Sequence, residues 1–213
     1  MPTAAQLDSM AERSDRKMKF TIKANRAMTH EIVPETIDNT ITEFKAALEP
    51  LMKDNLLLGV LLQFPESFHY DDEKRIYLDK LLKLMEEVPV IFEPRYMKWQ
   101  NDNVYAGLLK RNVGWCITDN PPLKNLPKLE PIITGKNSYI RFHGRNTEMW
   151  YTGNSETRYD YLYNDGELRA FVPIIRELLA KTLVVQIFFN NHSKAQAVIN
   201  AKKLELLLKI RIG

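Results

Sequence analysis

The chain has 213 residues, 45% of them hydrophobic and 27% charged, which is the composition of a globular protein able to bury a core. With 8 Gly, 11 Pro and 1 Cys, it is neither collagen-like, nor of low complexity, nor a disulfide scaffold. A net charge of +3, from 30 Lys and Arg against 27 Asp and Glu, permits an anionic partner such as nucleic acid without requiring one. From this length we expect a single domain.

Neither a membrane span nor a targeting segment is visible in the sequence. The longest apolar run, Leu56–Leu62, has the length of a strand and falls well short of the roughly 18 residues that a transmembrane helix needs. The stretch Met1–Met10 lacks the basic leader and apolar core of a signal peptide. Cys116 lies in a strand-like run and is expected to be a buried, inert thiol. We therefore expect a cytoplasmic protein without a membrane partner.

Segments with the period of a helix alternate with short apolar runs typical of strands. Several of these runs are apolar at nearly every residue, as in parallel strands covered on both faces. The alternation predicts an α/β fold with a parallel sheet. In chain order the predicted elements are a helix at Ala4–Lys17, a strand at Lys19–Ala24, a helix at Asp38–Lys53, a strand at Leu56–Phe64, a helix at Asp71–Glu87, a strand at Val88–Arg95, a helix at Asn103–Asn112, strands at Gly114–Asp119 and Ser138–Gly144, a helix at Glu167–Lys181, a strand at Leu183–Asn191 and a helix at Lys194–Ile210.

One connection is unusually long. From His143 to Asp165 the sequence is polar and aromatic and shows no regular period. Loops of this length in compact domains are usually binding loops or lids. We expect a functional loop here.

Polar residues gather where the predicted strands end. In parallel α/β folds the carboxyl ends of the strands and the loops after them form the ligand site. Strand alternation further places Arg141 and His143 on one face, and Glu93 with Arg95 on another such face. The polar residues at or just after the strand ends are Lys23, Asn25, Thr29 and His30, then Gln63, Glu93, Arg95 and Asp119, and finally Arg141, His143, Arg145, Asn190 and Asn191.

Five motifs in order resemble the YecE-like family, also catalogued as domain of unknown function seventy-two. The motifs are Lys23-Ala-Asn-Arg-Ala-Met-Thr-His30, Leu62-Gln-Phe-Pro65, Phe92-Glu-Pro-Arg95 with Trp99, Tyr139-Ile-Arg-Phe-His-Gly-Arg145, and Phe189-Asn-Asn191 followed by Asn200-Ala201. The resemblance runs from about Ala4 to Leu208. It implies a TIM-type (β/α)8 barrel with a site at the strand ends and no settled activity; a likeness in shape to sugar isomerases and apurinic endonucleases is an analogy of fold.

The resemblance also has departures. The family's first strand, first helix and second strand have no counterpart, so it implies an incomplete barrel with about six of the eight units, in a single partial domain over residues 1–213. Asn25 stands where the family usually has Pro. Pro94-Arg95-Tyr96 stands where it usually has Phe-Arg-His, which removes one histidine from the expected site.

The leading hypothesis is an enzyme acting on a small anionic molecule, phosphorylated or sugar-like. Arginine side chains suit the recognition of phosphate or carboxylate groups. His143 is the expected general acid or base, with Glu93 or Asp119 tuning it, in a hydrolase or isomerase. The structural alternative is that Glu93, Arg95 and Arg141 form an ion-pair network that only holds the barrel interior together. The expected binding residues are Lys23, His30, Gln63, Arg95, Trp99, Arg141, Arg145, Asn190 and Asn191.

Glu93, Asp119 and His143 could hold a divalent metal, but the cationic side chains nearby oppose a bound cation, so we expect neither a metal nor another cofactor. Two alternatives to the enzyme remain. The first is a nucleic-acid-binding or processing protein that uses the aromatic and basic loop 145–163, whose rings could instead pack as a lid. The second is an inactive partial domain that self-associates through open barrel edges. The loop residues concerned are Arg145, Trp150, Tyr151, Arg158, Tyr159, Tyr161 and Tyr163.

Overall fold

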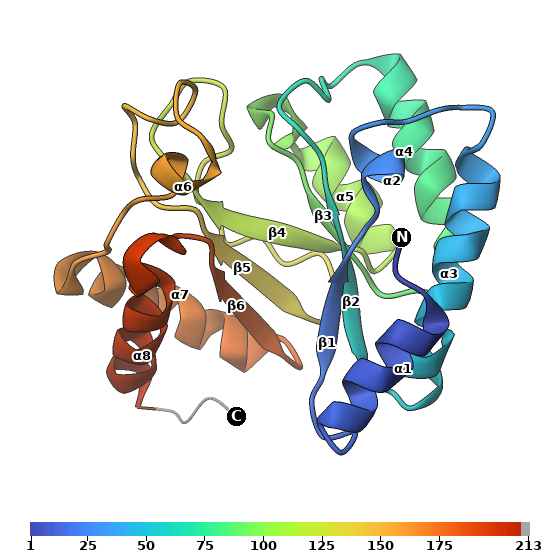
Figure 1. Cartoon of the computed structure of the whole chain (residues 1–213). Coiled ribbons are helices and arrows are strands. Elements are labelled where there is room, and N and C mark those ends of the chain that lie inside the picture. Colours follow the sequence, from blue (N-terminus) through green and yellow to red (C-terminus); the bar gives the residue numbers. More distant parts are fainter. Residues whose placement is uncertain (210–213) are drawn as a thin grey trace. The chain divides into compact units, whose positions relative to one another are not determined.

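Figure 1 shows the computed structural model of the chain, which describes residues 1–209. The chain divides into two compact units, Met1–Trp99 and Gln100–Gly213. Each unit alternates strands with helices, so the α/β class is confirmed. The single domain over residues 1–213 stays a prediction.

The first unit contains three parallel strands. Strand β1 pairs with β2 from Phe20↔Leu57 to Lys23↔Leu61, and β2 pairs with β3 from Val60↔Val90 to Gln63↔Glu93. Its elements are α1 (Ala4–Arg13), β1 (Phe20–Lys23), α2 (Arg26–Thr29), α3 (Ile37–Lys53), β2 (Leu57–Gln63), α4 (Asp72–Leu84), β3 (Val90–Glu93) and the 3₁₀ turn η1 (Met97–Trp99).

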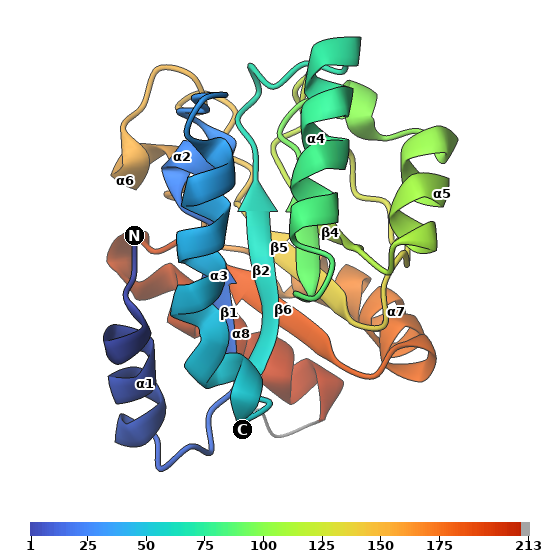
Figure 2. The same cartoon turned by 90° about the vertical axis from the view of Figure 1, so that its right-hand side faces the viewer.

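Local sequence explains where these helices start and what they bury. Asp71 caps α4, because its side chain accepts a hydrogen bond from the backbone N–H of Lys74. Helix α3 turns an apolar face toward the sheet, with Phe44 and Leu48 fully buried. Figure 2 shows α3 and α4 lying in front of β2, on one face of this sheet. The core of the first unit therefore lies between these helices and the strands.

The second unit has the same organisation. Strand β4 pairs in parallel with β5 from Cys116↔Tyr139 to Asp119↔Phe142, and β5 pairs with β6 from Ser138↔Val185 to Phe142↔Phe189. Helices α7 and α8 pack against each other (Figure 1). The elements are α5 (Asp102–Lys110), β4 (Gly114–Asp119), β5 (Ser138–Phe142), α6 (Ser155–Arg158), α7 (Asp165–Lys181), β6 (Val185–Phe189), the 3₁₀ turn η2 (Ser193–Ala195) and α8 (Gln196–Leu208).

All six strands and all six long helices predicted from the sequence are present, with ends that differ by a few residues. Cys116 is buried, as expected. The short helices α2 and α6 were not predicted, because four residues are too few to show a helical period. The prediction for the last helix extends to Ile210, which lies outside the described residues.

The expectation of a TIM-type (β/α)8 barrel with two units missing is wrong. The described residues form six strands, which the ladders above join in two parallel sets of three, whereas a barrel of that type closes on eight. The strand count read from the sequence pattern was right. The barrel was expected only from the family resemblance, because residue periodicity carries no information on whether a sheet closes.

Within residues 1–209 no helix combines the length and the apolar character that crossing a membrane would take.

Candidate functional site

The last residues of the three strands in the first unit are all polar. They are Lys23 in β1, Gln63 in β2 and Glu93 in β3. The register places Gln63 directly beside Glu93, and Nζ of Lys23 donates to Oε1 of Gln63 over 2.9 Å. The predicted cluster at this end of the first sheet therefore forms through direct contacts.

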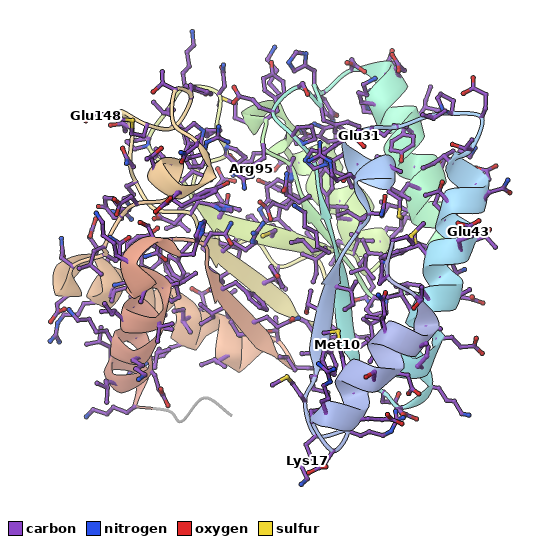
Figure 3. All side chains as sticks on the ribbon, in the orientation of Figure 1. Met10, Lys17, Glu31, Glu43, Arg95 and Glu148 are labelled. Atoms are coloured by element: carbon purple, nitrogen blue, oxygen red, sulfur yellow. The ribbon has the colours of Figure 1, made fainter. Side chains whose placement is uncertain are left out.

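Arg95 and Glu93 form a buried ion pair in the same unit. Glu93 is the last residue of β3 and Arg95 lies in the bend just after it, with Nε of Arg95 3.1 Å from Oε1 of Glu93. The Glu93 side chain is fully buried. Figure 3 shows Arg95 and Glu31 at the end of this unit toward which β2 runs, while Lys17 lies at the opposite end. Such a pair is costly to break, because either partner alone would be a buried charge.

His30 and Trp99 have contacts of different kinds. Nδ1 of His30 lies 2.8 Å from the hydroxyl of Thr29, and burial, followed by the charges of Lys23 and Arg26, lowers the pKa of the imidazole below its ordinary value. The indole N–H of Trp99 donates to the carbonyl of Phe68 over 2.8 Å, and the two rings stack. Trp99 is buried in the core of the first unit.

In the second unit Asp119 ends β4 and accepts hydrogen bonds from two side chains. Arg145 donates to both carboxylate oxygens, through Nε to Oδ2 at 3.0 Å and through Nη2 to Oδ1 at 2.9 Å. The buried hydroxyl of Tyr163 donates to Oδ2 over 2.6 Å. Burial and the Asp119 charge raise the pKa of Tyr163, so it stays a neutral donor. This carboxylate is held by a fixed set of donors.

Arg145 contacts a second carboxylate as well. Its Nη1 lies 3.2 Å from Oε1 of Glu167, the third residue of α7. Hydrogen bonding to Asp119 and the two nearby carboxylates raise the pKa of Arg145. Tyr161 donates to the same Glu167 oxygen, and burial together with Glu167 raises the pKa of Tyr161 to about 12. Arg145 therefore links β4 to the start of α7.

Three side chains at the ends of β5 and β6 form a second polar chain. Nη2 of Arg141 donates to Oδ1 of Asn190 over 2.8 Å, and Nδ2 of Asn190 lies 3.2 Å from Nδ1 of His143. His143 is fully buried. This places Arg141 and His143 on the same side, as the strand alternation predicted.

The loop 145–163 is tied to α8 and the turn before it. The carboxamide of Asn200 accepts from the backbone N–H of Tyr163 over 3.2 Å and donates to its carbonyl over 2.9 Å. Asn191 donates to the carbonyl of Tyr161 and to Oδ1 of Asn200, both over 2.8 Å. The side chain of Gln196 accepts from the N–H of Tyr161 over 3.0 Å. These contacts give Asn191 a role in holding the loop.

The aromatic residues of this loop pack mostly inward. Trp150 is 4% exposed and Tyr163 is fully buried, whereas Tyr151 is 57% exposed. The rings of Trp150 and Tyr159 meet edge to face at 5.9 Å, and His143 lies 6.4 Å from the first and 6.0 Å from the second. Trp150 and Tyr163 are thus buried within the second unit, and the role of the loop as a lid stays a prediction.

Gly144 separates His143 from Arg145 and needs to be glycine. Its φ is +83°, and a Cβ at this position would lie 2.7 Å from Cβ of Tyr161. The backbone N–H of Gly144 donates to the Tyr163 hydroxyl over 2.9 Å. This turn directs His143 and Arg145 to different partners.

The structure brings the predicted residues together in four contact groups, two in each unit. Lys23 contacts Gln63, and Glu93 contacts Arg95, in the first unit; Asp119 contacts Arg145, and Arg141 and His143 contact Asn190, in the second. Sequence reasoning missed Gln196, Glu167 and the role of Asn200. Gln196 and Asn200 are polar residues four apart on the otherwise apolar, buried face of α8. Polar residues on such a face were the sequence signal that could have identified them. Among residues 1–209 no group of three or more His, Cys, Asp or Glu side chains could hold a metal ion.

The fold and these strand-end clusters define an α/β protein of parallel strands with polar side chains at their carboxyl ends. A family model described as "Protein of unknown function DUF72" matches residues 1–212, so the chain belongs to the DUF72 family. This confirms the resemblance to the YecE-like family, which is an equivalent name.

Individual relatives agree with this assignment. The chain is 30% identical over 207 residues to the UPF0759 protein YunF of Bacillus subtilis strain 168, covering 90% of this chain and 73% of the relative. A solved DUF72 family protein of Thermotoga maritima MSB8 superposes with a TM-score of 0.90 at 31% identity, over 98% of this chain and 80% of that one. A DUF72 family protein of Enterococcus faecalis V583 shares the fold, with a TM-score of 0.88 at 23% identity over 100% and 82% of the two chains.

Proposed function

We propose that the protein binds a small anionic molecule, phosphorylated or sugar-like, at the carboxyl ends of β5 and β6. Arg141 and His143 are the contact residues. The observation that carries the proposal is the chain of hydrogen bonds from Arg141 through Asn190 to His143.

The chemistry of the three side chains supports an anionic ligand. A guanidinium has five N–H donors and no acceptor, and that of Arg141 donates to the neutral carboxamide of Asn190. Planar guanidinium groups match phosphate and carboxylate oxygens. Arg145 contacts two carboxylates, those of Asp119 and Glu167. We therefore assign ligand contact to Arg141 and a structural role to Arg145 and Asp119.

The remaining predicted residues belong to the first unit. Within the first unit, taken by itself, Lys23, His30, Gln63 and Arg95 are proposed binding residues and Glu93 is a proposed acid–base carboxylate. The support for them is their place at the ends of β1, β2 and β3. Trp99 supports the first unit through packing, and Asn191 supports the second through loop attachment.

Binding to defined probes tests the proposal. Isothermal titration calorimetry would compare inorganic phosphate, glucose 6-phosphate, gluconate and neutral glucose as ligands. We expect an anionic probe to bind, and R141Q to weaken that binding by about tenfold or more, since a hydrogen bond to a charged group is worth about 1.5–3 kcal/mol. R176Q is the matched control, because Arg176 is exposed on α7 of the same unit.

Two results would overturn the assignment. One is unchanged affinity in R141Q. The other is the absence of binding by every anionic probe at millimolar concentration.

A nucleic-acid partner has less support, because Trp150 and Tyr163 are buried and offer no face for base stacking. Titrating a single-stranded oligonucleotide in the same calorimetric experiment distinguishes a nucleic-acid-binding protein from one that binds a small anion. Affinity for single-stranded DNA that falls steeply with salt, with no response to phosphate, would favour nucleic acid over a small anion.

A further inference from the structure

We infer that Arg158, in the loop 145–163, is a further binding residue for the anionic group of the ligand. The inference rests on the proposed function for the class of ligand, a small molecule that carries a phosphate or carboxylate group. It adds to the strand ends of the second unit a cationic side chain that the loop supplies.

Arg158 is a half-buried arginine whose guanidinium has no counter-ion. Among the residues whose side chains the structure describes, none forms an ion pair with it, and its buried Nε has no hydrogen-bond partner. The other arginine of the loop, Arg145, contacts the carboxylates of Asp119 and Glu167. Buried polar atoms are nearly always hydrogen-bonded in folded proteins, so this exception calls for an explanation. Contact with an anionic ligand supplies one.

The acidic residues next to Arg158 in the sequence do not neutralise it. Asp160, two residues further on, is 2.8 Å from Nζ of Lys194 and accepts from the side chain of Gln196 over 2.7 Å. Glu156, two residues before, is exposed to solvent. The positive charge of Arg158 is therefore available to an anion from outside the chain.

The backbone on both sides of Arg158 is held by side-chain hydrogen bonds. Arg158 is the last residue of α6, and the side chain of Asn154 caps this helix by accepting from the backbone N–H of Thr157 over 2.9 Å. Nδ2 of Asn146 donates to the carbonyls of Thr157 and Asp160, over 3.1 and 3.3 Å. A residue on a backbone that is already ordered loses less conformational freedom when it binds a ligand.

Trp150 positions the guanidinium without using its donors. Cζ of Arg158 lies 6.0 Å from the centroid of the Trp150 ring, within the range of a cation–π contact. Such a contact involves the charge and the face of the ring, and it leaves every N–H group of the guanidinium for oxygen acceptors. Planar guanidinium groups match the oxygen atoms of phosphate and carboxylate.

The same aromatic rings connect Arg158 to the strand ends. The Trp150 ring lies 6.4 Å from the ring of His143, and the ring of Tyr159, the residue after Arg158, lies 6.0 Å from it. Tyr159 is also 6.0 Å from the exposed ring of His192, which follows β6. Arg158 thus belongs to the part of the loop that packs against the ends of β5 and β6, where the proposed ligand binds.

Trp150 provides a spectroscopic probe beside Arg158. The chain has 3 Trp, whose indole N–H groups give separate signals in a ¹H–¹⁵N correlation spectrum, and sequential assignment identifies them without any variant. We expect titration with inorganic phosphate, at constant ionic strength, to shift the Trp150 signal to saturation and to leave those of Trp99 and Trp115 in place. A Trp150 signal that does not move at millimolar phosphate would overturn the inference.

Substitutions at Arg158 provide the second measurement. We expect R158Q to bind phosphate about tenfold more weakly or worse, and R158K to retain part of the binding, because lysine keeps the charge without the planar donors. R176Q, at an exposed position on α7 of the same unit, should bind as the wild type does. A purely structural Arg158 would instead lower the Tm of R158Q and leave the affinity of the folded protein intact. Unchanged phosphate affinity in folded R158Q would overturn the inference.

Comparison with R141Q separates this inference from the proposed function. If R158Q weakens phosphate binding and R141Q does not, Arg158 stands as an anion contact and the assignment of Arg141 fails. If R141Q weakens binding and R158Q does not, the proposed function stands and the inference fails. If R158Q weakens binding of single-stranded DNA while phosphate does not bind at all, the contact is to a nucleic-acid backbone, and the small anionic ligand is overturned.

Discussion

Arg145 and Asp119 meet side on, with two N–H groups of the guanidinium directed at the two oxygens of one carboxylate. They are 26 residues apart in the sequence: Asp119 is the last residue of β4, and Arg145 lies just past the end of β5. The Asp119 side chain is 5% exposed and that of Arg145 is 33% exposed. The pair is partly shielded from water, so its electrostatic contribution is larger than that of a surface ion pair.

Removing the Asp119 charge should therefore destabilise the fold. For D119N we expect a loss of about 2 to 4 kcal/mol in the free energy of unfolding, less than for a fully buried pair because Arg145 keeps Glu167 and some solvent. Urea unfolding followed by circular dichroism measures it. K181Q is the control, since the exposed Lys181–Glu177 pair on α7 should contribute under about 0.5 kcal/mol. Similar losses in D119N and K181Q would disprove the structural role of the pair.

Asn200 should determine the order of the loop 145–163. In N200A the backbone N–H and carbonyl of Tyr163 both lose their partner, which should cost about 2 to 3 kcal/mol. We also expect limited proteolysis to cut within the loop faster than in the wild type. K202A, exposed on the same helix, should behave as the wild type. An unchanged cleavage rate in N200A would mean that other contacts suffice to hold the loop.

The turn before α8 contains backbone strain that glycine should relieve. Ala195 has φ 60° and ψ 17°, in the left-handed region that alanine adopts at a cost. A195G should stabilise the protein by about 1 kcal/mol. A197G, within α8, should instead destabilise it by about 1 kcal/mol, because glycine is a poor helix former. Thermal unfolding of the two variants side by side checks the opposite signs; a loss of stability in A195G would contradict the strain.

His30 should make stability depend on pH. Burial, then Lys23 and Arg26, lowers its pKa below the ordinary 6.5, so the unfolded chain takes up this proton more readily than the folded one. The contribution of His30 to the free energy of unfolding is fully present above pH 6.5. It is lost as the pH falls from 6.5 through the lower pKa that His30 has in the folded state. H30Q should therefore lose less stability than the wild type between pH 7.5 and pH 5, measured by urea midpoints. H69Q, at an exposed position in the same unit, should keep the wild-type slope; a slope unchanged in H30Q would exclude His30 as the cause.

The local sequence pattern was enough to predict the helices and strands and the side of a strand on which each side chain lies. The runs Gly114–Asp119 and Ser138–Gly144 identified β4 and β5, because alternation and β-branched or aromatic content depend only on neighbours in the chain. The same alternation placed Arg141 and His143 on one side. It could not give the number of strands needed to close a sheet, and the incomplete (β/α)8 barrel implied by the family resemblance was wrong.

Partners of the polar residues were decided by tertiary structure alone. The sequence grouped Lys23, Arg95, Arg141 and Arg145 as one cationic set for a ligand. The fold instead gives Arg145 two carboxylates and Arg141 a carboxamide that lies 49 residues further along the chain.

The sequence by itself thus determined the order of helices and strands, the polar character of the strand ends and membership of the DUF72 family. Only the tertiary structure decided that Asn190 faces both Arg141 and His143, and with which atoms. The physical reason is that each hydrogen bond depends on the register of two packed strands and on which atom donates, and neither is written in the spacing of residues along one strand.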